Sequence, residues 1–364
     1  MGKLLLLILL IAAAAAGWLW YSINYPYQGF SPEGVFVEVP HGSSSRSVAR
    51  LLERKGVVRN SVAFEIYARR HPRRSLQAGE YFFDRATSAH DVFWKLANGQ
   101  VFEQPFTVRE GETMFDIARD LEAGKFMPAD EFLRAAKDPT QIQDIAPKAA
   151  TLEGFLFPAT YHLSRHPSAT ALATDMVRKF KEEWATVTSP ASSADAMTSS
   201  GTFTEATQTD PPAAVNNAPP SSRPVTAIVT LASLVERETP KAEERPLVAG
   251  VFENRLHKNM LLQCDPTVIY ALEQQGRYNG TLSTADLHID SPYNSYTHTG
   301  LPPGPIGNPG EASLRAAYRP AHTDYLYFVA NTQGGHFFSS TLAEHNNNVI
   351  KYRRLLAGEQ ASTR

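Results

Sequence analysis

The sequence predicts an α+β protein that begins with a single membrane-spanning helix. Three observations favour this fold class: an uncharged apolar run at the start, a strand–turn–helix pattern that occurs twice, and a longer segment in which helical and strand patterns both occur. A chain of 364 residues is long enough for two or three domains. We expect a cytoplasmic tip and membrane anchor at 1–22 and a first repeat with its connector at 30–105. A second repeat should follow at 106–150, and a mixed α+β domain at 151–357.

Composition excludes several classes of protein. The net charge of −2 and a sequence pI near 6.6 give no reason to expect a nucleic acid partner. Cys264 is the single cysteine, so the chain has no intrachain disulfide and no zinc site built on several thiolates. The eleven histidines, including His336 and His345, show no close pairing of metal ligands. We therefore expect neither a metal nor a cofactor.

The N-terminus reads as a membrane anchor. After Lys3 the chain runs without a charge from Leu4 to Leu19, and aromatic residues typical of a membrane interface close the run at Trp18, Trp20 and Tyr21. No Lys or Arg follows until Arg46, which predicts a cytoplasmic N-terminus with the rest of the chain outside. The alternative is a cleaved signal peptide, because Ala12–Ala16 offers small residues for a cleavage site.

An internal repeat follows the anchor. The segment Val39–Ser44 is matched by Val108–Thr113, and each predicts a strand, a glycine turn and a helix with Ser or Thr in its first turn. The similarity continues into a second helix, around Phe64 in one copy and Phe132 in the other. The second copy resembles the LysM module, which binds glycans containing N-acetylglucosamine. The first copy is a looser match, and a packing unit without a ligand is the alternative for both.

Residues 189–223 differ sharply in composition from their surroundings. Ser, Thr, Ala, Pro and Asn dominate this stretch, and it has almost no large apolar residue. Such a segment cannot bury enough apolar surface to become ordered, so we predict a disordered insertion.

The helix predicted at Val225–Val235 ends next to two glutamates. Its polar residues fall on one stripe, at Thr226, Thr230, Ser233 and Arg237. Glu236 and Glu238 lie off that stripe, so they should point at protein or into a cleft, where desolvation can keep a carboxyl protonated for use as a general acid. The alternative is a structural glutamate paired with Arg237 or Arg245.

Candidate binding residues lie further along the chain. Gln263 and Asp265 directly precede an apolar helix, although an Asp before Pro is also an ordinary helix cap. A loop dense in Pro and Gly follows, in which Tyr293 and Tyr296 offer flat faces to a sugar ring and Asn294 offers an amide. We also predict a helix at Val248–Met260, a buried strand at Tyr325–Ala330 and a hairpin at Gly334–Phe338.

Together these segments resemble the YceG-like family of membrane-anchored endolytic murein transglycosylases. The resemblance runs from Thr151 to about Ala357 and rests on LEGFLFPATY, LASLVERET, VFENRL, LQCDPTVIY, SPYNSYTHTGLPPGPIGNPG and YLYFVANTQGGHFF, all in family order. Two features depart from the family pattern: Ala159, where an Asp is common, and the insertion at 189–223.

The resemblance implies a reaction and a set of roles. The first glutamate of the motif, Glu236, would protonate the β-1,4 bond between N-acetylmuramic acid and N-acetylglucosamine, and the muramyl 6-hydroxyl would close a 1,6-anhydro ring. No second catalytic carboxylate is then required. The candidates for substrate positioning are Glu238, Gln263, Asp265, Tyr293, Asn294 and Tyr296.

The same resemblance implies a location and partners. The anchor would lie in the inner (cytoplasmic) membrane with the catalytic domain in the periplasm, near nascent glycan strands and peptidoglycan synthases. Two alternatives remain: a muramidase-type hydrolase on the same scaffold, and a glycan-binding scaffold with little or no cleavage activity.

Overall fold

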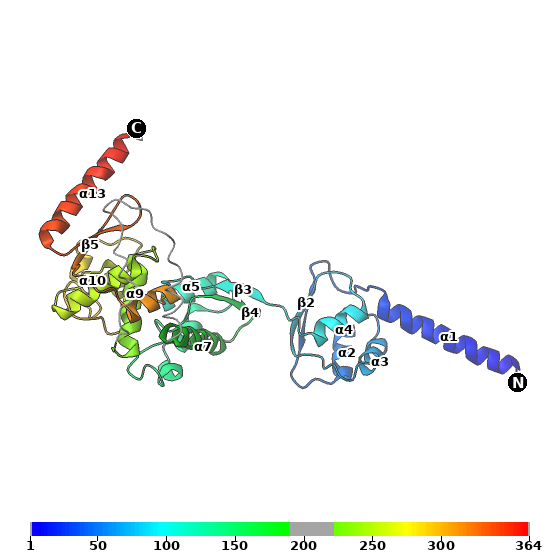
Figure 1. Cartoon of the computed structure of the whole chain (residues 1–364). Coiled ribbons are helices and arrows are strands. Elements are labelled where there is room, and N and C mark those ends of the chain that lie inside the picture. The colour runs from blue at the N-terminus through cyan, green and yellow to red at the C-terminus, as the bar shows by residue number, and fades with distance from the viewer. Residues whose placement is uncertain (1, 190–221, 363–364) are drawn as a thin grey trace. The chain divides into compact units, whose positions relative to one another are not determined.

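The computed structural model describes residues 2–189 and 222–362 and divides into two compact units (Figure 1). Unit 1 comprises residues 1–105 with 162–165, and unit 2 comprises 106–161 with 166–364. The insertion predicted at 189–223 lies, apart from its ends, outside the described residues.

Unit 1 begins with α1, Gly2–Asn24, a helix long and apolar enough to cross a membrane. Its leucine-rich part is exposed, and its buried residues are Ser22 and Ile23 near the C-terminal end, where α1 contacts the helices α3 and α4. The helix predicted at the N-terminus is therefore present, and the exposure of its apolar side chains is compatible with a membrane anchor.

The first copy of the repeat forms its own core within unit 1. Its elements are β1 (Val35–Val39), α2 (Ser45–Arg54), α3 (Ser61–Arg69), β2 (Gly79–Phe83) and α4 (Ala89–Ala97). The strands β1 and β2 pair antiparallel, with Val37 opposite Tyr81, and both of these side chains are fully buried among the apolar residues of the three helices. Ser44 caps α2 by accepting a hydrogen bond from the Ser47 amide.

The second copy repeats the strand–helix–helix–strand order and has an additional short helix before its second strand. It comprises β3 (Gln104–Thr107), α5 (Met114–Ala123), α6 (Ala129–Ala136), the short helix η1 (Pro139–Ile142) and β4 (Thr160–Leu163), and β3 pairs with β4. Thr113 and Asp116 form a reciprocal capping box at the start of α5. The predicted strand–turn–helix order is present in both copies, while their kinship to LysM stays a prediction.

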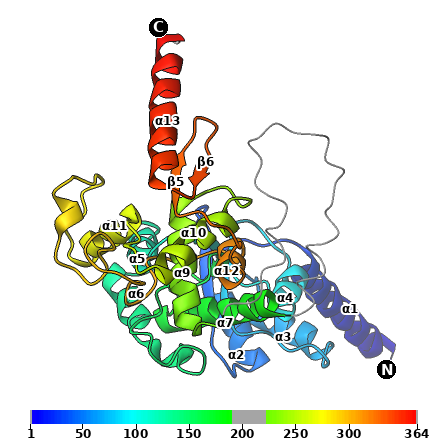
Figure 2. The ribbon, with the colours of Figure 1, turned by 60° about the vertical axis from the view of Figure 1, so that its left-hand side comes forward.

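The remainder of unit 2 is built around α9, which Figure 2 shows among α10, α11 and α12. The elements in chain order are α7 (Ala169–Thr188), α9 (Val225–Glu238), α10 (Arg245–His257), α11 (Asp265–Gln274), η3 (Asp286–His288), α12 (Glu311–Tyr318), β5 (Tyr327–Ala330), β6 (His336–Ser339) and α13 (Leu342–Ser362). The predicted hairpin is present as the antiparallel pair β5–β6.

Three local predictions need correction. The glutamate helix extends to Glu238, so both glutamates lie within its last turn. The middle of the polar stripe is buried: Thr230 and Ser233 are 2% and 0% exposed, and Ser233 Oγ accepts a hydrogen bond from the Ile306 amide and donates one to the Thr230 carbonyl. The strand β5 is half-buried along its length, since β5 and β6 form a two-stranded sheet packed against α13.

Candidate active site

The two glutamates at the end of α9 face different surroundings. Residues two apart on a helix point in directions roughly 200° apart, so Glu236 and Glu238 cannot share one pocket. The interactions of their carboxyl groups show which of the predicted binding residues lies with which glutamate.

Glu236 is held inside the protein by donors on both of its carboxyl oxygens. Its Oε1 lies 2.7 Å from Arg245 Nη2, and its Oε2 accepts a hydrogen bond from the Gly310 amide at 2.9 Å. The two side chains of the ion pair are only 5% and 7% exposed, and Arg245 also lies 3.4 Å from Glu110 Oε2. Burial raises the pKa of Glu236, while the Gly310 amide and Arg245 act in the opposite direction.

The ion pair between Glu236 and Arg245 is the structural alternative that the sequence left open. None of the other predicted binding residues interacts with Glu236 in the described part of the chain. Its immediate environment consists of Arg245, Glu110, Gly310 and Ser313. The carboxylate therefore ties the end of α9 to α10 and to the start of α12.

Glu238 interacts electrostatically with two of the predicted binding residues, Asp265 and Tyr296. Burial raises the pKa of Glu238, a hydrogen bond from Cys264 lowers it, and nearby Asp265 raises it further. His336 and Arg255 also interact electrostatically with this carboxyl. Glu236 and Glu238 are both half-buried as whole residues, so exposure does not distinguish the two carboxyl groups. Burial raises the pKa of both, which is what the sequence analysis required of a general acid, and the difference between them is the set of residues around each.

Gln263, Asp265 and Tyr296 form the exposed edge of this cluster. Gln263 is exposed and has a φ of 52°, a left-handed conformation that is uncommon for a residue other than glycine and is enriched at binding and catalytic sites. Tyr296 donates a hydrogen bond from its hydroxyl to Asp265 Oδ1. Burial and this hydrogen bond raise the pKa of Tyr296, so its hydroxyl stays protonated near neutral pH. The N-cap of α11 is Cys264, which leaves the Asp265 carboxyl free of a capping role.

Asn294 and Tyr293 do not fit the binding roles predicted for them. The Asn294 side chain is completely buried: its amide donates to the carbonyls of Leu287 and Ile289, and its oxygen accepts from the Tyr296 amide. Asn294 therefore shapes the loop that carries Tyr296 and has no group left for a sugar. Tyr293 packs its ring 5.0 Å from that of Tyr270 within a small apolar cluster, so its ring is partly covered by protein.

The sequence analysis did not assign several residues that surround Glu238. Arg255 is buried, donates to the carbonyls of Leu326, Leu261 and Leu262, and so connects α10 to the hairpin and to the Gln263 segment. His336 reaches Glu238 from β6. Both residues occur inside quoted motifs, but nothing in the spacing of one segment indicates which other segment it meets.

A buried polar network fixes the loop beneath the site. The Asn308 side chain makes four hydrogen bonds, accepting from the amides of Gly154 and Leu156 and donating to the Glu112 carbonyl and to Glu153 Oε1. Glu153 is 1% exposed and also accepts from the Met114 amide at the start of α5. Burial raises the pKa of Glu153 to about 8. The network joins the second copy of the repeat to the loop that precedes α12.

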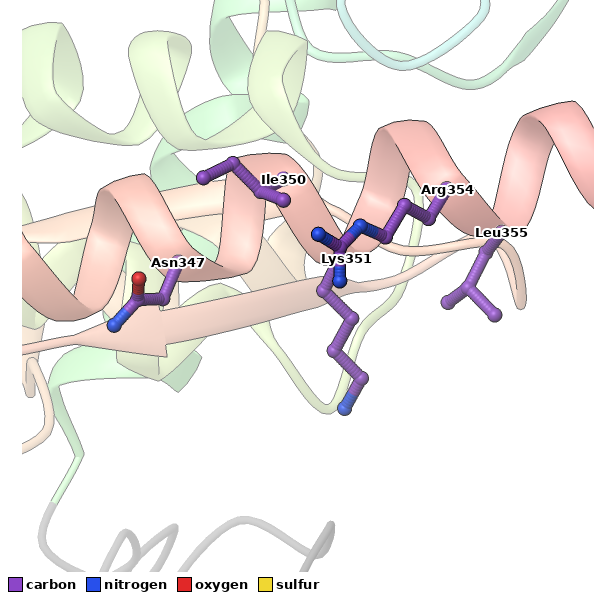
Figure 3. A pocket seen from close by; sticks show the side chains of 5 residues that line it. All are labelled: Asn347, Ile350, Lys351, Arg354 and Leu355. Atoms are coloured by element: carbon purple, nitrogen blue, oxygen red, sulfur yellow. The ribbon is translucent and has the colours of Figure 1, made fainter.

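The described residues contain no group of His, Cys, Asp and Glu that could hold a metal ion. A surface pocket on α13 is lined by Asn347, Ile350, Lys351, Arg354 and Leu355 (Figure 3). All five come from this one helix, and none of the residues around Glu236 or Glu238 lines it, so it is not part of the candidate active site.

Comparisons with known proteins agree with the motifs. The YceG-like family matches residues 37–351. The chain is 31% identical over 346 residues to the endolytic murein transglycosylase of Bacillus subtilis, covering 91% of this chain and 88% of that one. It is 30% identical over 359 residues to the enzyme of that name from Streptococcus pneumoniae, covering 90% of this chain and 60% of the longer relative.

A solved structure is also similar. The crystal structure of a YceG-like protein from Listeria monocytogenes matches with a TM-score of 0.52 and 31% sequence identity. The match covers 87% of this chain and 99% of the Listeria chain.

Proposed function

Because the chain belongs to the YceG-like family, we propose that it is an endolytic murein transglycosylase, the activity for which its curated relatives are named. Its substrate is the glycan strand of peptidoglycan, and it cleaves the β-1,4 bond between N-acetylmuramic acid and N-acetylglucosamine. The products end in 1,6-anhydro-N-acetylmuramic acid, so cleavage of nascent strands terminates their elongation.

The proposed reaction needs one proton donor beside the scissile bond. The acid gives its proton to the glycosidic oxygen as that oxygen leaves with the electron pair of the C1–O bond. The muramyl 6-hydroxyl then attacks C1, and its proton is taken up by a base. A general acid of this kind contributes roughly 10²–10⁴-fold to the rate, and alignment of the 6-hydroxyl contributes further.

We assign the donor role to Glu238, which exchanges the roles that the family resemblance implied for the two glutamates. The observation that supports this exchange is the position of the binding candidates: Asp265 lies beside Glu238, and Glu236 instead forms a buried ion pair with Arg245. Burial raises the pKa of Glu238, so its carboxyl can hold a proton for the leaving oxygen. Glu236 then serves to position the end of α9.

The exposed edge of the cluster supplies the contacts to sugar. Gln263 and Asp265 are exposed, and the half-buried Tyr296 adds a flat ring and a hydroxyl. These groups suit the hydroxyl and N-acetyl groups of an amino sugar. Asn294 acts indirectly, by holding the Tyr296 loop in place.

The location follows from α1. We propose that α1 anchors the chain in the inner membrane as a single span, with Lys3 and the N-terminus in the cytoplasm and both units in the periplasm. Such an anchor keeps the enzyme close to nascent strands and to the peptidoglycan synthases that make them.

The test compares Glu238→Gln with Glu236→Gln in the full chain. Both variants keep the shape of the side chain and remove the ionisable proton. We expect Glu238→Gln to remain folded and to lose cleavage by roughly 10²-fold or more. Glu236→Gln weakens a buried ion pair, so it should lower the free energy of unfolding by up to about 3–5 kcal/mol and lower turnover by no more than about tenfold where it is folded.

Mass spectrometry of digested peptidoglycan measures the products, and thermal unfolding followed by circular dichroism measures stability. Reducing ends in place of anhydro ends would identify a hydrolase, and the absence of cleavage by the wild-type chain would refute enzymatic activity. Loss of turnover in a folded Glu236→Gln with an active Glu238→Gln would return the donor role to Glu236.

A further inference from the structure

A histidine–carboxylate pair at the start of β6 has no role in the mechanism described so far. His336 Nδ1 lies 2.6 Å from Glu244 Oε2, and the His336 amide donates to Glu244 Oε1 at 2.9 Å. The two side chains are 12% and 11% exposed. A carboxylate can only accept hydrogen bonds, so in the neutral imidazole Nδ1 carries the proton and Nε2 carries the free lone pair.

The protein around Glu244 is built to hold that carboxylate still. A Cβ atom placed on Gly335 would lie 2.2 Å from Glu244 Oε1, so a larger residue at this position would displace the carboxylate from the imidazole. Thr239 Oγ1 lies 3.4 Å from Glu244 Oε2 on another side. The orientation of the imidazole is therefore fixed from β6 and from the segment between α9 and α10.

The pair is linked to the residue that follows the proposed proton donor, because Thr239 Oγ1 lies 3.4 Å from Glu244 Oε2. His336 also interacts electrostatically with Glu238, and the rings of Phe328 and Phe338 pack against the imidazole with centroids at 5.3 and 6.3 Å. Within the described residues, Nδ1 is the ring nitrogen that has a hydrogen-bond partner. The other charged groups around this pair of residues are Lys241, Arg255 and Asp265.

We propose that His336 is a second acid–base group of the active site, oriented by Glu244 and acting together with Glu238. This inference rests on the proposed function. In this mechanism His336 Nε2 accepts the proton of the attacking 6-hydroxyl. In a mechanism with a single carboxyl, the glutamate that acted as the acid would accept that proton instead. Glu244 is a positioning residue, since it acts only through the imidazole.

The protons and electron pairs balance over one cycle. Glu238 gives its proton to the leaving oxygen, and the C1–O bond breaks with its electron pair on that oxygen. The 6-hydroxyl oxygen forms the new bond to C1, and its proton passes to His336 Nε2. The imidazolium then returns this proton to the Glu238 carboxylate, which regenerates both groups without consuming water.

The variant His336→Asn distinguishes a catalytic role for His336 from a purely structural one. An asparagine amide can take the place of Nδ1 and still donate to Glu244, but it has nothing at the position of Nε2. If the pair only fastens the hairpin to α10, His336→Asn should be active. If Nε2 is the base, turnover should fall by roughly 10²-fold at an unchanged KM and melting temperature.

The separate values of kcat and KM supply a readout that distinguishes a base from a structural contact. Loss of the base lowers kcat at an unchanged KM, whereas a displaced hairpin would also raise KM and lower the melting temperature. Glu244→Gln serves as the second variant if His336→Asn does not fold. The neutral amide no longer holds the imidazole as the carboxylate does, so kcat should fall by about tenfold at an unchanged KM.

His90→Asn is the matched control, because His90 Nδ1 lies 3.0 Å from Asp91 in unit 1, and it should behave as wild type. Anhydro ends formed by His336→Asn at the wild-type rate would overturn this inference alone. An unchanged kcat in Glu244→Gln would also overturn it. Absence of anhydro ends from the wild-type chain would instead refute the proposed function.

Discussion

The two copies of the strand–turn–helix pattern have similar local structure and different surroundings. Gly42 and Gly111 occupy matching turns with φ of 73° and 80°. A Cβ atom on Gly42 would meet nothing within 4 Å, whereas one on Gly111 would lie 3.4 Å from Glu236 Cγ. The Gly111 amide also donates to the Asn308 carbonyl at 2.8 Å. The same turn is therefore a surface feature in unit 1, while in unit 2 it lies against Glu236 at the end of α9.

The helices that follow the turns differ in the same way. Ser44, the cap of α2, lies at an exposed helix start, while Thr113, the cap of α5, is fully buried in its capping box. At the first residue of α5, the Met114 amide donates to the buried Glu153. A local pattern thus determines how a segment folds, and its tertiary neighbours determine whether that segment contributes to a site.

The prediction with the largest expected effect on stability removes the side chain of Asn308, which joins the second copy to the rest of unit 2. In Asn308→Ala four buried hydrogen bonds are lost, and the amides of Gly154 and Leu156 are left without a partner. Each buried group left unsatisfied costs about 1–3 kcal/mol, so we expect unit 2 to lose more than about 4 kcal/mol of its free energy of unfolding. Hydrogen exchange on the full chain in detergent, read separately for each unit, measures the loss.

Asn60→Ala is the matched control in the first copy. Asn60 caps α3 with one hydrogen bond to the Ala63 amide, so its removal should cost about 1 kcal/mol and affect unit 1 alone. Similar losses in the two variants would mean that the Asn308 network does not stabilise the second copy more than an ordinary cap does.

The sequence predicted the local structure of both copies well because that structure depends on neighbours along the chain. Glycine turns, Ser or Thr caps and helical spacing are all short-range signals. Similarly, the apolar run predicted α1, and the motif LASLVERET predicted a helix directly followed by two glutamates, which the structure places in its last turn. Family motifs then identified the kind of protein.

The sequence could not indicate which glutamate faces which partner. Glu236 and Glu238 are both on flanks of one helix, and their surroundings are set by Arg245, Cys264 and His336 from three other segments. Asn294 illustrates the same limit: an amide in a rigid loop looked available for a sugar, and the structure instead buries it as the support of that loop.

The second prediction concerns pH and the carboxyl beneath α5. Burial raises the pKa of Glu153 from 4.5 to about 8, so between these values the folded chain keeps a proton that the unfolded chain releases. The contribution to stability is therefore fully present below about pH 4.5 and is lost as pH rises to about 8, with a slope of up to roughly 1.4 kcal/mol per unit. Apparent melting temperatures of unit 2 should fall over this range.

Glu153→Gln should flatten this pH dependence, because a neutral amide has no proton to lose. Glu65→Gln in the first copy, where the carboxylate pairs with Arg46 and Arg69 on the surface, should leave it unchanged. An identical slope in the wild type and in Glu153→Gln would show that Glu153 is ionised throughout, held as an anion by the Met114 amide and Asn308.

The prediction with the smallest expected effect compares the two turns directly. Gly42→Ala and Gly111→Ala each place a Cβ atom in a left-handed conformation, which costs roughly 1–2 kcal/mol in either unit. The new methyl group is unopposed in the first turn. In the second it touches Glu236, which holds the end of α9 through Arg245. We therefore expect similar losses of stability, but a fall in turnover, of up to about tenfold, only in Gly111→Ala.

This outcome also bears on the roles of the two glutamates. If Glu236 only positions α9, the methyl group of Gly111→Ala displaces the helix slightly. Glu238 on the other side of the helix keeps its proton, so turnover falls without disappearing. If Glu236 were the proton donor, the methyl group would lie against the catalytic carboxyl itself, and a loss approaching that of Glu236→Gln would follow. Equal turnover in Gly42→Ala and Gly111→Ala, measured as anhydro ends per minute, would mean that contact with Glu236 does not distinguish the second turn from the first.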